Sequence, residues 1–205
     1  MARILIVVVL SFGLGGLLAS GAAVWPVPPG VAGALLMMLV ALVVRRRWGL
    51  LADTAPGSPE RMLWVSLAAN AVVAGHLLAA MYHIGPTLVM HTPVVHALGR
   101  DSWTLVAGAL LAYWIVRDPA PRADERDRAI ASQGLRTAHY GLLTVLVVQI
   151  LVLGFVHDGW VSQLSRPTIA HALILAIIAS VLVDAIARLR AYALEAMASE
   201  ADLHQ

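Results

Sequence analysis

The chain contains no cysteine and no lysine, and only 13% of its residues are charged. The absence of cysteine excludes disulfide bonds, thiolate metal sites and cysteine nucleophiles. A soluble domain has about 25% charged and about 45–50% apolar residues, whereas this chain is 60% hydrophobic. The 14 basic residues are all arginine and cluster between apolar runs. That pattern indicates a membrane protein with a defined orientation, and no nucleic-acid partner is expected.

Motifs of soluble enzymes are also missing. The sequence has no glycine-rich phosphate loop, no G-x-S-x-G nucleophile elbow and no H-E-x-x-H metal motif. Five glycines in the first two apolar runs fit close packing of membrane helices better than phosphate binding. They are Gly13, Gly15, Gly16, Gly30 and Gly33. These features favour a protein that is not an enzyme.

Six apolar runs predict an all-α bundle of six transmembrane helices, because about 20 residues cross a hydrocarbon core of about 30 Å. The runs cover residues 4–24, 30–44, 62–82, 103–116, 138–156 and 168–186, within one membrane domain, 1–205. The second and fourth runs are short, so we expect tilted helices or extensions at their ends. The first run also resembles a signal peptide, but we interpret it as a membrane helix.

The placement of the arginines predicts how the chain is oriented. Only Arg100 and Arg166 fall on one side of a six-pass protein. The other twelve are Arg3, Arg45, Arg46, Arg47, Arg61, Arg117, Arg122, Arg126, Arg128, Arg136, Arg188 and Arg190. Arginine-rich loops stay in the cytoplasm. We therefore expect three hairpins with both termini cytoplasmic.

The second and third of these hairpins resemble each other in sequence. The matching residues are His83-Ile84-Gly85 with His157-Asp158-Gly159, and Pro93 and His96 with Pro167 and His171. Because both hairpins run the same way, the pattern predicts a parallel repeat about an axis along the membrane normal.

A charged segment, residues 122–137, precedes the fifth apolar run. Asp124 is a favourable N-cap, and acidic residues suit the first turn of a helix. Asp124 and Arg128 stand four residues apart and are expected to pair. The segment is either a solvated amphipathic lead-in to the membrane helix or a docking face for another protein. The residues of that face are Asp124, Glu125, Arg126, Asp127 and Arg128.

The D-E-R-D stretch at 124–127, with Ile130, Gly134 and Tyr140 after it, resembles a group of small bacterial multi-pass membrane proteins. Proteins of this group carry such a stretch in a cytoplasmic loop, and many are encoded beside small helix-turn-helix regulators. The resemblance covers about residues 118–190. It implies a multi-pass protein of the bacterial inner membrane with this segment in the cytoplasm, and it implies no reaction.

Three polar side chains inside apolar runs are functional candidates, because such residues are costly in a membrane. Asn70 and Gln149 lie near mid-bilayer at about 1.5 Å per residue. We interpret them as an amide pair that joins the third and fifth helices, the alternative being a transport path. Asp184 precedes Arg188 by four residues, which predicts an ion pair.

Arg100 and Asp101 stand just ahead of Trp103. They mark the water interface, with Trp103 as an aromatic anchor, if the fourth helix begins near Trp103. If that helix begins at Pro93 instead, both charges lie inside the membrane. The sequence leaves the choice open.

Histidines are the only residues in this sequence that suggest chemistry. Five of them are expected on or near the extracytoplasmic side, and they are His76, His83, His96, His157 and His171. Neutral imidazole is the commonest ligand for zinc, copper and haem iron. We interpret the set as interfacial histidines that face headgroups and water, and the alternative is a site for haem b or for a copper or zinc ion.

Three functional hypotheses follow. The first is a non-enzymatic accessory subunit or membrane sensor in the bilayer. Its cytoplasmic face, residues 124–136 and the tail 188–205, would contact a protein partner or a second copy. The second is a haem or metal protein for electron transfer or metal handling. The third is a small transporter with Asn70 and Gln149 along its path, although no charged residue lies near mid-bilayer.

Overall fold

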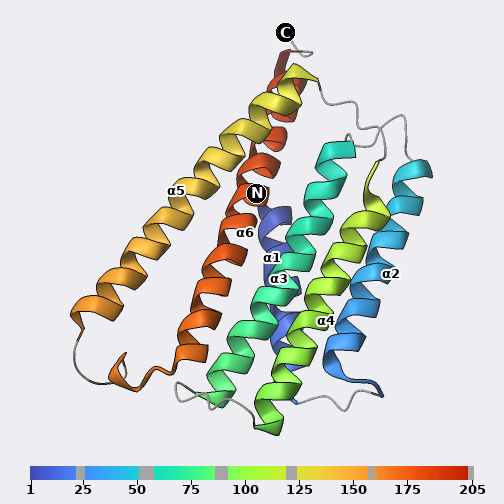
Figure 1. Ribbon diagram of the computed structural model, residues 1–205. Coiled ribbons are helices and arrows are strands. Elements are labelled where there is room, and N and C mark those ends of the chain that lie inside the picture. Colours follow the sequence, from blue (N-terminus) through green and yellow to red (C-terminus); the bar gives the residue numbers. More distant parts are fainter. Residues whose placement is uncertain are drawn as a thin grey trace.

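The computed structural model describes residues 1–21, 26–50, 58–85, 92–118, 124–156, 159 and 161–202. Among these residues the structure is all helical and has no strand. The helices are α1 (Ala2–Ala19), α2 (Pro29–Leu50), α3 (Ser58–Ile84), α4 (Pro93–Val116), α5 (Glu125–Phe155), the short 3-10 helix η1 (Val161–Gln163) and α6 (Arg166–Asp202). Successive α-helices run in opposite directions, so α1 starts and α6 ends toward the same end of the bundle (Figure 1). The expected all-α fold is confirmed for this part of the chain.

Five of the described helices are long and apolar enough to cross a membrane, namely α1, α2, α3, α5 and α6. The remaining α-helix, α4, is 24 residues long but falls outside this group. Its first half carries Arg100, Asp101 and Ser102 in succession, which lowers its apolar character. The expectation of six membrane spans is therefore met by length and composition for five helices.

Helix α4 begins at Pro93, ten residues before the apolar run 103–116 that predicted it. The hydroxyl of Thr92 accepts a hydrogen bond from the Val95 N–H, and Pro93 occupies the first helical position. Both features favour a helix start. The first expected run, 4–24, is in turn too long, since α1 ends at Ala19.

The turns at one end of the bundle share a backbone pattern. Gly21, Gly85 and Gly159 have positive φ angles of 65°, 84° and 75°, which glycine adopts without steric cost. A proline follows eight residues after each, and the three are Pro29, Pro93 and Pro167. Each proline is the first or second residue of α2, α4 or α6, where its missing N–H removes no helical hydrogen bond. The same turn-to-helix spacing thus occurs three times.

Close contacts between helix backbones hold α1 to α3 and α2 to α4. A side chain at Gly15 would collide with the α3 backbone at Val72, and one at Gly75 would collide with the α1 backbone at Phe12. Between α2 and α4, a side chain at Gly30 would collide with the Asp101 backbone, whereas one at Gly33 would meet the end of the Leu105 side chain. Small residues allow such approaches in membrane bundles. The packing role expected for Gly15 and Gly33 is confirmed, whereas a Cβ at Gly13 would have nothing within 4 Å.

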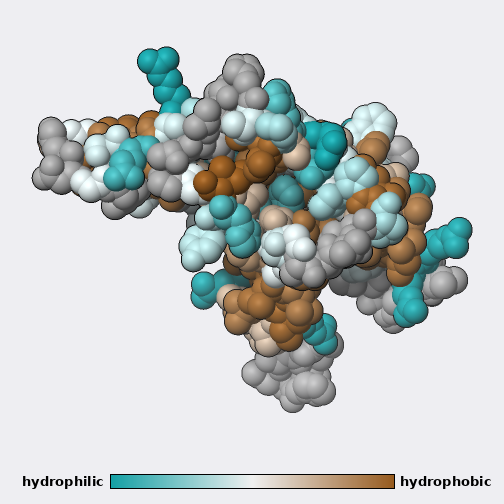
Figure 2. All heavy atoms as spheres, turned by 90° about the horizontal axis from the view of Figure 1, so that it is seen from below, coloured by the Kyte–Doolittle hydropathy of each residue, from teal (hydrophilic) through white to brown (hydrophobic). Residues whose placement is uncertain are grey.

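The contacts between helices differ from those expected of three independent hairpins in series. Helices α1 and α2 touch little, and each packs instead on the second pair, α3 and α4. Helix α3 is central, because it also contacts α6. Helix α5 packs on α6 and diverges from the other helices (Figure 1). Seen from the end opposite the one where α6 ends, hydrophobic side chains cover much of the sides of the helices (Figure 2).

Two arginines cap the C-terminal end of α4. The Arg45 guanidinium donates a hydrogen bond to the Ile115 carbonyl over 2.8 Å, and that of Arg61 donates to the Val116 carbonyl over 3.1 Å. These carbonyls have no partner within the helix, and cations suit the negative end of the helix dipole. Arg45 and Arg61 therefore join α2 and α3 to α4 at the arginine-rich end of the bundle.

Candidate functional site

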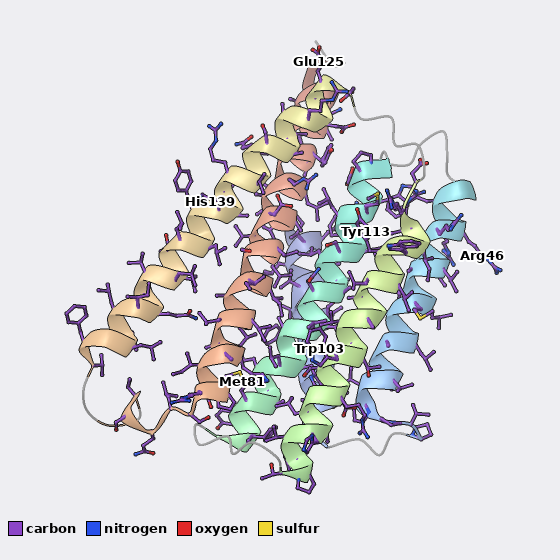
Figure 3. All side chains as sticks on the ribbon, in the orientation of Figure 1. Arg46, Met81, Trp103, Tyr113, Glu125 and His139 are labelled. Atoms are coloured by element: carbon purple, nitrogen blue, oxygen red, sulfur yellow. The ribbon has the colours of Figure 1, made fainter. Side chains whose placement is uncertain are left out.

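The charged start of α5 packs against the far end of α6. Together these segments, residues 124–136 and 184–198, form what we call the α5–α6 arm. Helices α5 and α6 are 31 and 37 residues long, or about 46 and 55 Å. The arm rises beyond the ends of α2, α3 and α4, with Glu125 near its tip (Figures 1 and 3). The expected lead-in is thus continuous with α5, and the tail continues α6 as far as Asp202.

Asp124 begins the arm as an N-cap. Its carboxylate accepts the Asp127 N–H over 2.7 Å, while the Asp127 carboxylate accepts the Asp124 N–H over 3.4 Å. This reciprocal capping box satisfies two N–H groups of the first turn. The cap prediction is confirmed. The expected Asp124–Arg128 ion pair is not formed, because the Asp124 carboxylate faces the backbone and Arg128 reaches Asp124 only through its backbone N–H.

The D-E-R-D residues also contact α6 directly. The Tyr192 hydroxyl donates to the Asp127 carboxylate over 2.6 Å. Arg126 forms an ion pair with Glu195, and its guanidinium lies 5.8 Å from the centre of the Tyr192 ring. Tyr192 lies past the apolar part of α6, beyond Arg188 and Arg190. Burial and the hydrogen bond to Asp127 raise its pKa above the usual range.

Further along the arm, Gly134 lets α5 approach α6. A side chain there would collide with Arg188 and stand 2.6 Å from the Asp184 carboxylate. The Arg188 guanidinium donates to that carboxylate over 3.0 Å, which confirms the expected ion pair. Ile130 and Leu189 are buried in the same cluster as Tyr192. The face of the α5 segment that points toward α6 is therefore occupied. A docking surface for another protein would lie on the outer side of the arm.

Other residues of the arm remain free to contact a partner. Glu125 and Arg128 are exposed on α5. On α6, Arg190 is exposed, and Leu194 and Met197 are 51% and 57% exposed. These three stand at i, i+4 and i+7, so they share one face of the helix. Two large apolar side chains thus face outward beside an arginine.

A second polar site lies inside the bundle. Because α4 begins at Pro93, Arg100 and Asp101 lie within the helix, and Trp103 is not at its start. Asp101 is only 8% exposed, and the Arg100 Nε lies 3.4 Å from its carboxylate. The Asp101 backbone abuts Gly30 in the first turn of α2, where the helix dipole favours a negative charge.

His76 of α3 is also buried in the bundle. The imidazole is 3% exposed, and its Nδ1 is buried without a hydrogen-bond partner. Asp101 is close enough to interact with it electrostatically. The metal ligation that the sequence suggested for His76 finds no support, because no group of three His, Asp or Glu side chains among the described residues could hold a metal ion.

The expected amide pair between Asn70 and Gln149 is not formed. The Asn70 amide donates to the carbonyl and hydroxyl of Ser66 in its own helix, over 2.8 and 3.2 Å. Gln149 donates to the Ala172 carbonyl over 3.2 Å and so joins α5 to α6. The two amides have different partners because α5 packs on α6 and lies away from α3.

Asn70 instead lines a cavity of about 390 Å³ between α3, α4 and α6, which we call the lateral groove. His171 lines the same groove, so two residues selected from the sequence meet there. Its polar lining also includes Ser66 and Ser102. The rest of the lining is almost entirely apolar and includes Trp103 of α4, which lies in the half of that helix nearer its start (Figure 3).

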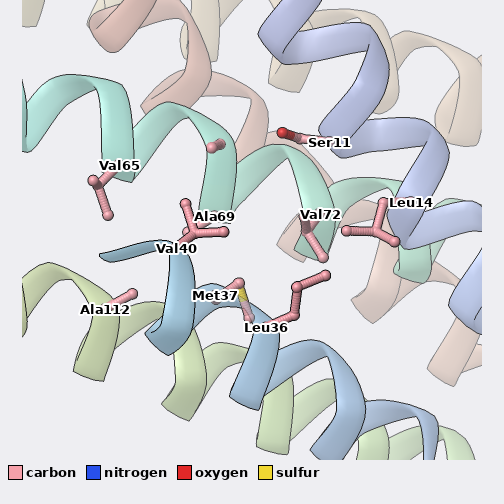
Figure 4. Close-up of a pocket in the computed structure, with 10 residues that line it drawn as sticks. Ser11, Leu14, Leu36, Met37, Val40, Val65, Ala69, Val72 and Ala112 are labelled. Carbon is pink, nitrogen blue, oxygen red and sulfur yellow. The ribbon is translucent and has the colours of Figure 1, made fainter. Parts of the chain in front are cut away.

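Two further cavities have fewer polar groups. One, of about 340 Å³, lies between α5 and α6 and includes Gln149. The other, of about 140 Å³, lies between the first four helices and is lined by apolar side chains except for Ser11 (Figure 4). Apolar cavities of this kind remain dry.

The histidines do not form a metal centre in the described part of the chain. His76 is buried, whereas His83 and His96 are exposed, and the His83 ring stands edge-on to Tyr82 at 5.9 Å. His157 lies outside the described residues. Within those residues, no three His, Asp or Glu side chains come close enough to hold a metal ion. The structure thus gives the haem and metal hypothesis no support.

Several residues of these sites were missed by reasoning from the sequence. Tyr192 and Glu195 stand three residues apart on one helical face, a spacing that could have indicated contact with α5. Ser102 carried no such signal, because a serine in a helix usually bonds its own backbone. No protein-family model, curated protein or solved structure matches the chain, so its function must be argued from these sites.

Proposed function

We propose that the chain is a non-enzymatic multi-pass protein of the bacterial inner membrane that acts as a sensor or accessory subunit. Its α5–α6 arm lies in the cytoplasm and binds another protein. The observation that carries this proposal is the arm itself, a packed pair of charged helix ends that bears exposed Leu194 and Met197.

The orientation is supported by the distribution of arginine. Those at the start of α1, α3 and α5 and toward the end of α2, α4 and α6 gather at one end of the bundle. Arg122 of this set lies outside the described residues. Positively charged segments of this length stay in the cytoplasm. Both termini would then be cytoplasmic, and the three glycine-to-proline turns would be extracytoplasmic.

The chemistry of the partner follows from the exposed face of α6. Arg190, Leu194 and Met197 make a stripe of one cation and two apolar anchors, which suits insertion into a groove of another protein. The partner should present an apolar groove with an acidic residue at one end. This surface replaces the D-E-R-D residues as the contact, because Arg126 and Asp127 are occupied by α6.

Co-purification from native membranes tests the proposal. A stoichiometric partner should be retained by the unaltered chain and lost from the double variant Leu194→Asp, Met197→Asp. The matched control is Ala196→Asp, because Ala196 is exposed on the same turn but points away from the stripe. The control should retain the partner, and both variants should keep the thermal stability of the parent.

Two results would contradict this assignment. Retention of the partner by the double variant would exclude the stripe as the contact. If the protein purifies from native membranes as a monomer with no partner, it is not an accessory subunit. A dimer that is lost in the double variant would instead identify a second copy of the chain as the partner.

A further inference from the structure

The lateral groove exists because α4 and α6 scarcely touch although both pack on α3. Its walls come from α4 and α6 and its floor from α3. Along α6 it extends from His171 to Val181, or about 15 Å. Its volume of about 390 Å³ is that of a small-molecule site. Since α3 and α6 are among the helices that can cross a membrane, the groove opens toward lipid.

Polar groups stand among the apolar walls at particular places. The Ser102 hydroxyl is buried without a hydrogen-bond partner, which costs free energy unless a ligand supplies one. The His171 Nδ1 lies 2.7 Å from the Pro167 carbonyl, to which it donates. The Nε2 of a neutral His171 is then an acceptor. Ser102 and His171 both belong to the first half of their helices, toward the same end of the bundle.

The α4 wall leaves room for a chain-like ligand. A Cβ added at Gly99 would meet nothing within 4 Å. Trp103, 74% exposed, stands one helical turn further along the groove. Toward the C-terminal ends of α4 and α6 the walls are aliphatic, with Val106 on α4 and Ile174 and Ile178 on α6. An alkyl chain would replace lipid against these walls, and its polar group would meet the unpaired hydroxyl.

We propose that the lateral groove binds one single-chain amphiphile whose polar group both donates and accepts hydrogen bonds, as a protonated fatty acid does. The polar group accepts from Ser102 and donates to His171, while the alkyl chain lies between α4 and α6. A diacyl phospholipid has a second chain that a groove of this volume does not hold, and a fatty acid methyl ester has no proton to donate to His171.

Quenching of Trp103 fluorescence by a fatty acid dibrominated at mid-chain tests the proposal, with the full-length chain in phosphatidylglycerol vesicles. The chain has 6 tryptophans, so the Trp103→Phe variant defines the share that Trp103 contributes. We expect saturable quenching at one fatty acid per chain. The dibrominated methyl ester should bind about two- to tenfold more weakly, which is the net worth of one hydrogen bond.

Two variants locate the site. Gly99→Leu fills the groove and should weaken binding about tenfold or more, as overpacking does. Gly13→Leu is the matched control, because Gly13 of α1 also has nothing within 4 Å and lies outside the groove. Ser102→Ala should weaken binding of the acid about two- to tenfold. Each variant is compared with the parent by circular dichroism.

Three outcomes overturn the proposal. Quenching that rises in proportion to probe, without saturation and equally for a dibrominated phosphatidylcholine, means that only bulk lipid fills the groove. Saturable quenching that is the same in Gly99→Leu and Gly13→Leu places the fatty acid elsewhere. Equal affinity for the acid and its methyl ester would show that the ligand donates no hydrogen bond to His171. The assigned ligand class would then be wrong.

Discussion

The first four helices and the last two are held together by different means. In the block α1–α4, glycines bring backbones into contact. Of the most apolar stretch of α3, 61% is buried inside the bundle. In α5 the corresponding share is 6%. The helix is joined to α6 by an ion pair and a tyrosine–carboxylate hydrogen bond at one end, and by the Gln149 amide further along. Close packing fixes the block along its length, whereas polar contacts fix the arm at its tip.

The difference has a physical basis in the solvent. Apolar side chains gain little by leaving lipid for one another, so helices within a membrane associate through close packing and hydrogen bonds. Beyond the hydrocarbon, water makes apolar burial and charge pairing available again. The cluster of Ile130, Leu189 and Tyr192 belongs to that second regime. The same cluster includes Ile4 of α1 and Leu63 and Leu67 of α3, so the apolar part of the arm also packs on the block.

The largest expected effect is on the packing of the first four helices. Gly15→Ala places a Cβ against the Val72 carbonyl of α3, and we expect it to lower the free energy of unfolding by about 3 kcal/mol. Gly13→Ala, two residues away with nothing within 4 Å, should be neutral or stabilising by at most about 1 kcal/mol. Thermal unfolding in detergent measures both. Equal effects of the two variants would show that α1 does not approach α3 at Gly15.

The next largest effect is expected at the buried Asp101 carboxylate of α4 and its exposed partner Arg100. Arg100→Gln leaves the Asp101 carboxylate without its ion-pair partner, at an expected cost of about 2 kcal/mol. Adding Asp101→Asn removes the buried charge and should restore most of that stability. Unfolding of the single and double variants under the same conditions distinguishes the cases. A double variant that is less stable than Arg100→Gln would rule out the pair as the cause.

In the arm, Tyr192→Phe removes the hydrogen bond to Asp127 and should cost about 1 kcal/mol. Tyr140→Phe, at a tyrosine that is 63% exposed, is the control and should change nothing. Because the pKa of Tyr192 is raised in the folded chain, its contribution is complete below the usual tyrosine pKa of about 10. It is lost as the pH rises through the higher folded value. The difference in the free energy of unfolding between the parent and Tyr192→Phe should therefore become smaller in strong alkali. A difference that does not change with pH would contradict this.

The smallest expected effect is at the surface of the arm. Arg126→Ala removes the ion pair with Glu195, whose two side chains are about half exposed, and should cost about 0.5 kcal/mol. Raising the salt concentration should reduce this difference through screening. A loss as large as that of Gly15→Ala would mean that the arm is as tightly built as the block.

The sequence predicted the positions of the helices better than the contacts between them. Apolar runs predicted the helices, although α4 begins ten residues earlier than its run. The pattern of capping residues predicted the Asp124 N-cap, and a spacing of four residues predicted the pair of Asp184 and Arg188. Which helices meet was not predictable, because a lipid-facing apolar side and a helix-facing one look alike in composition. Asn70 and Gln149 were therefore assigned to each other, although α6 lies beside Gln149.

The sites were predictable in part for the same reason. Asn70 stood out as a polar group in an apolar run and His171 as one of five histidines near one side of the membrane, and both line the lateral groove. Asp101 could be placed only after the start of α4 was known. The resemblance to small bacterial multi-pass proteins and the cytoplasmic position of the D-E-R-D stretch remain predictions.

Cross-linking across the arm tests the central claim most directly, and a chain without cysteine makes it clean. The double variant Arg126→Cys, Glu195→Cys, treated in native membranes with a short bis-maleimide, should form an intramolecular cross-link. The pair His139→Cys, Glu195→Cys moves one cysteine 13 residues, or about 20 Å, along α5 and should form none. Cross-linking of the second pair but not the first, or of neither, would show that the start of α5 does not pack on the end of α6.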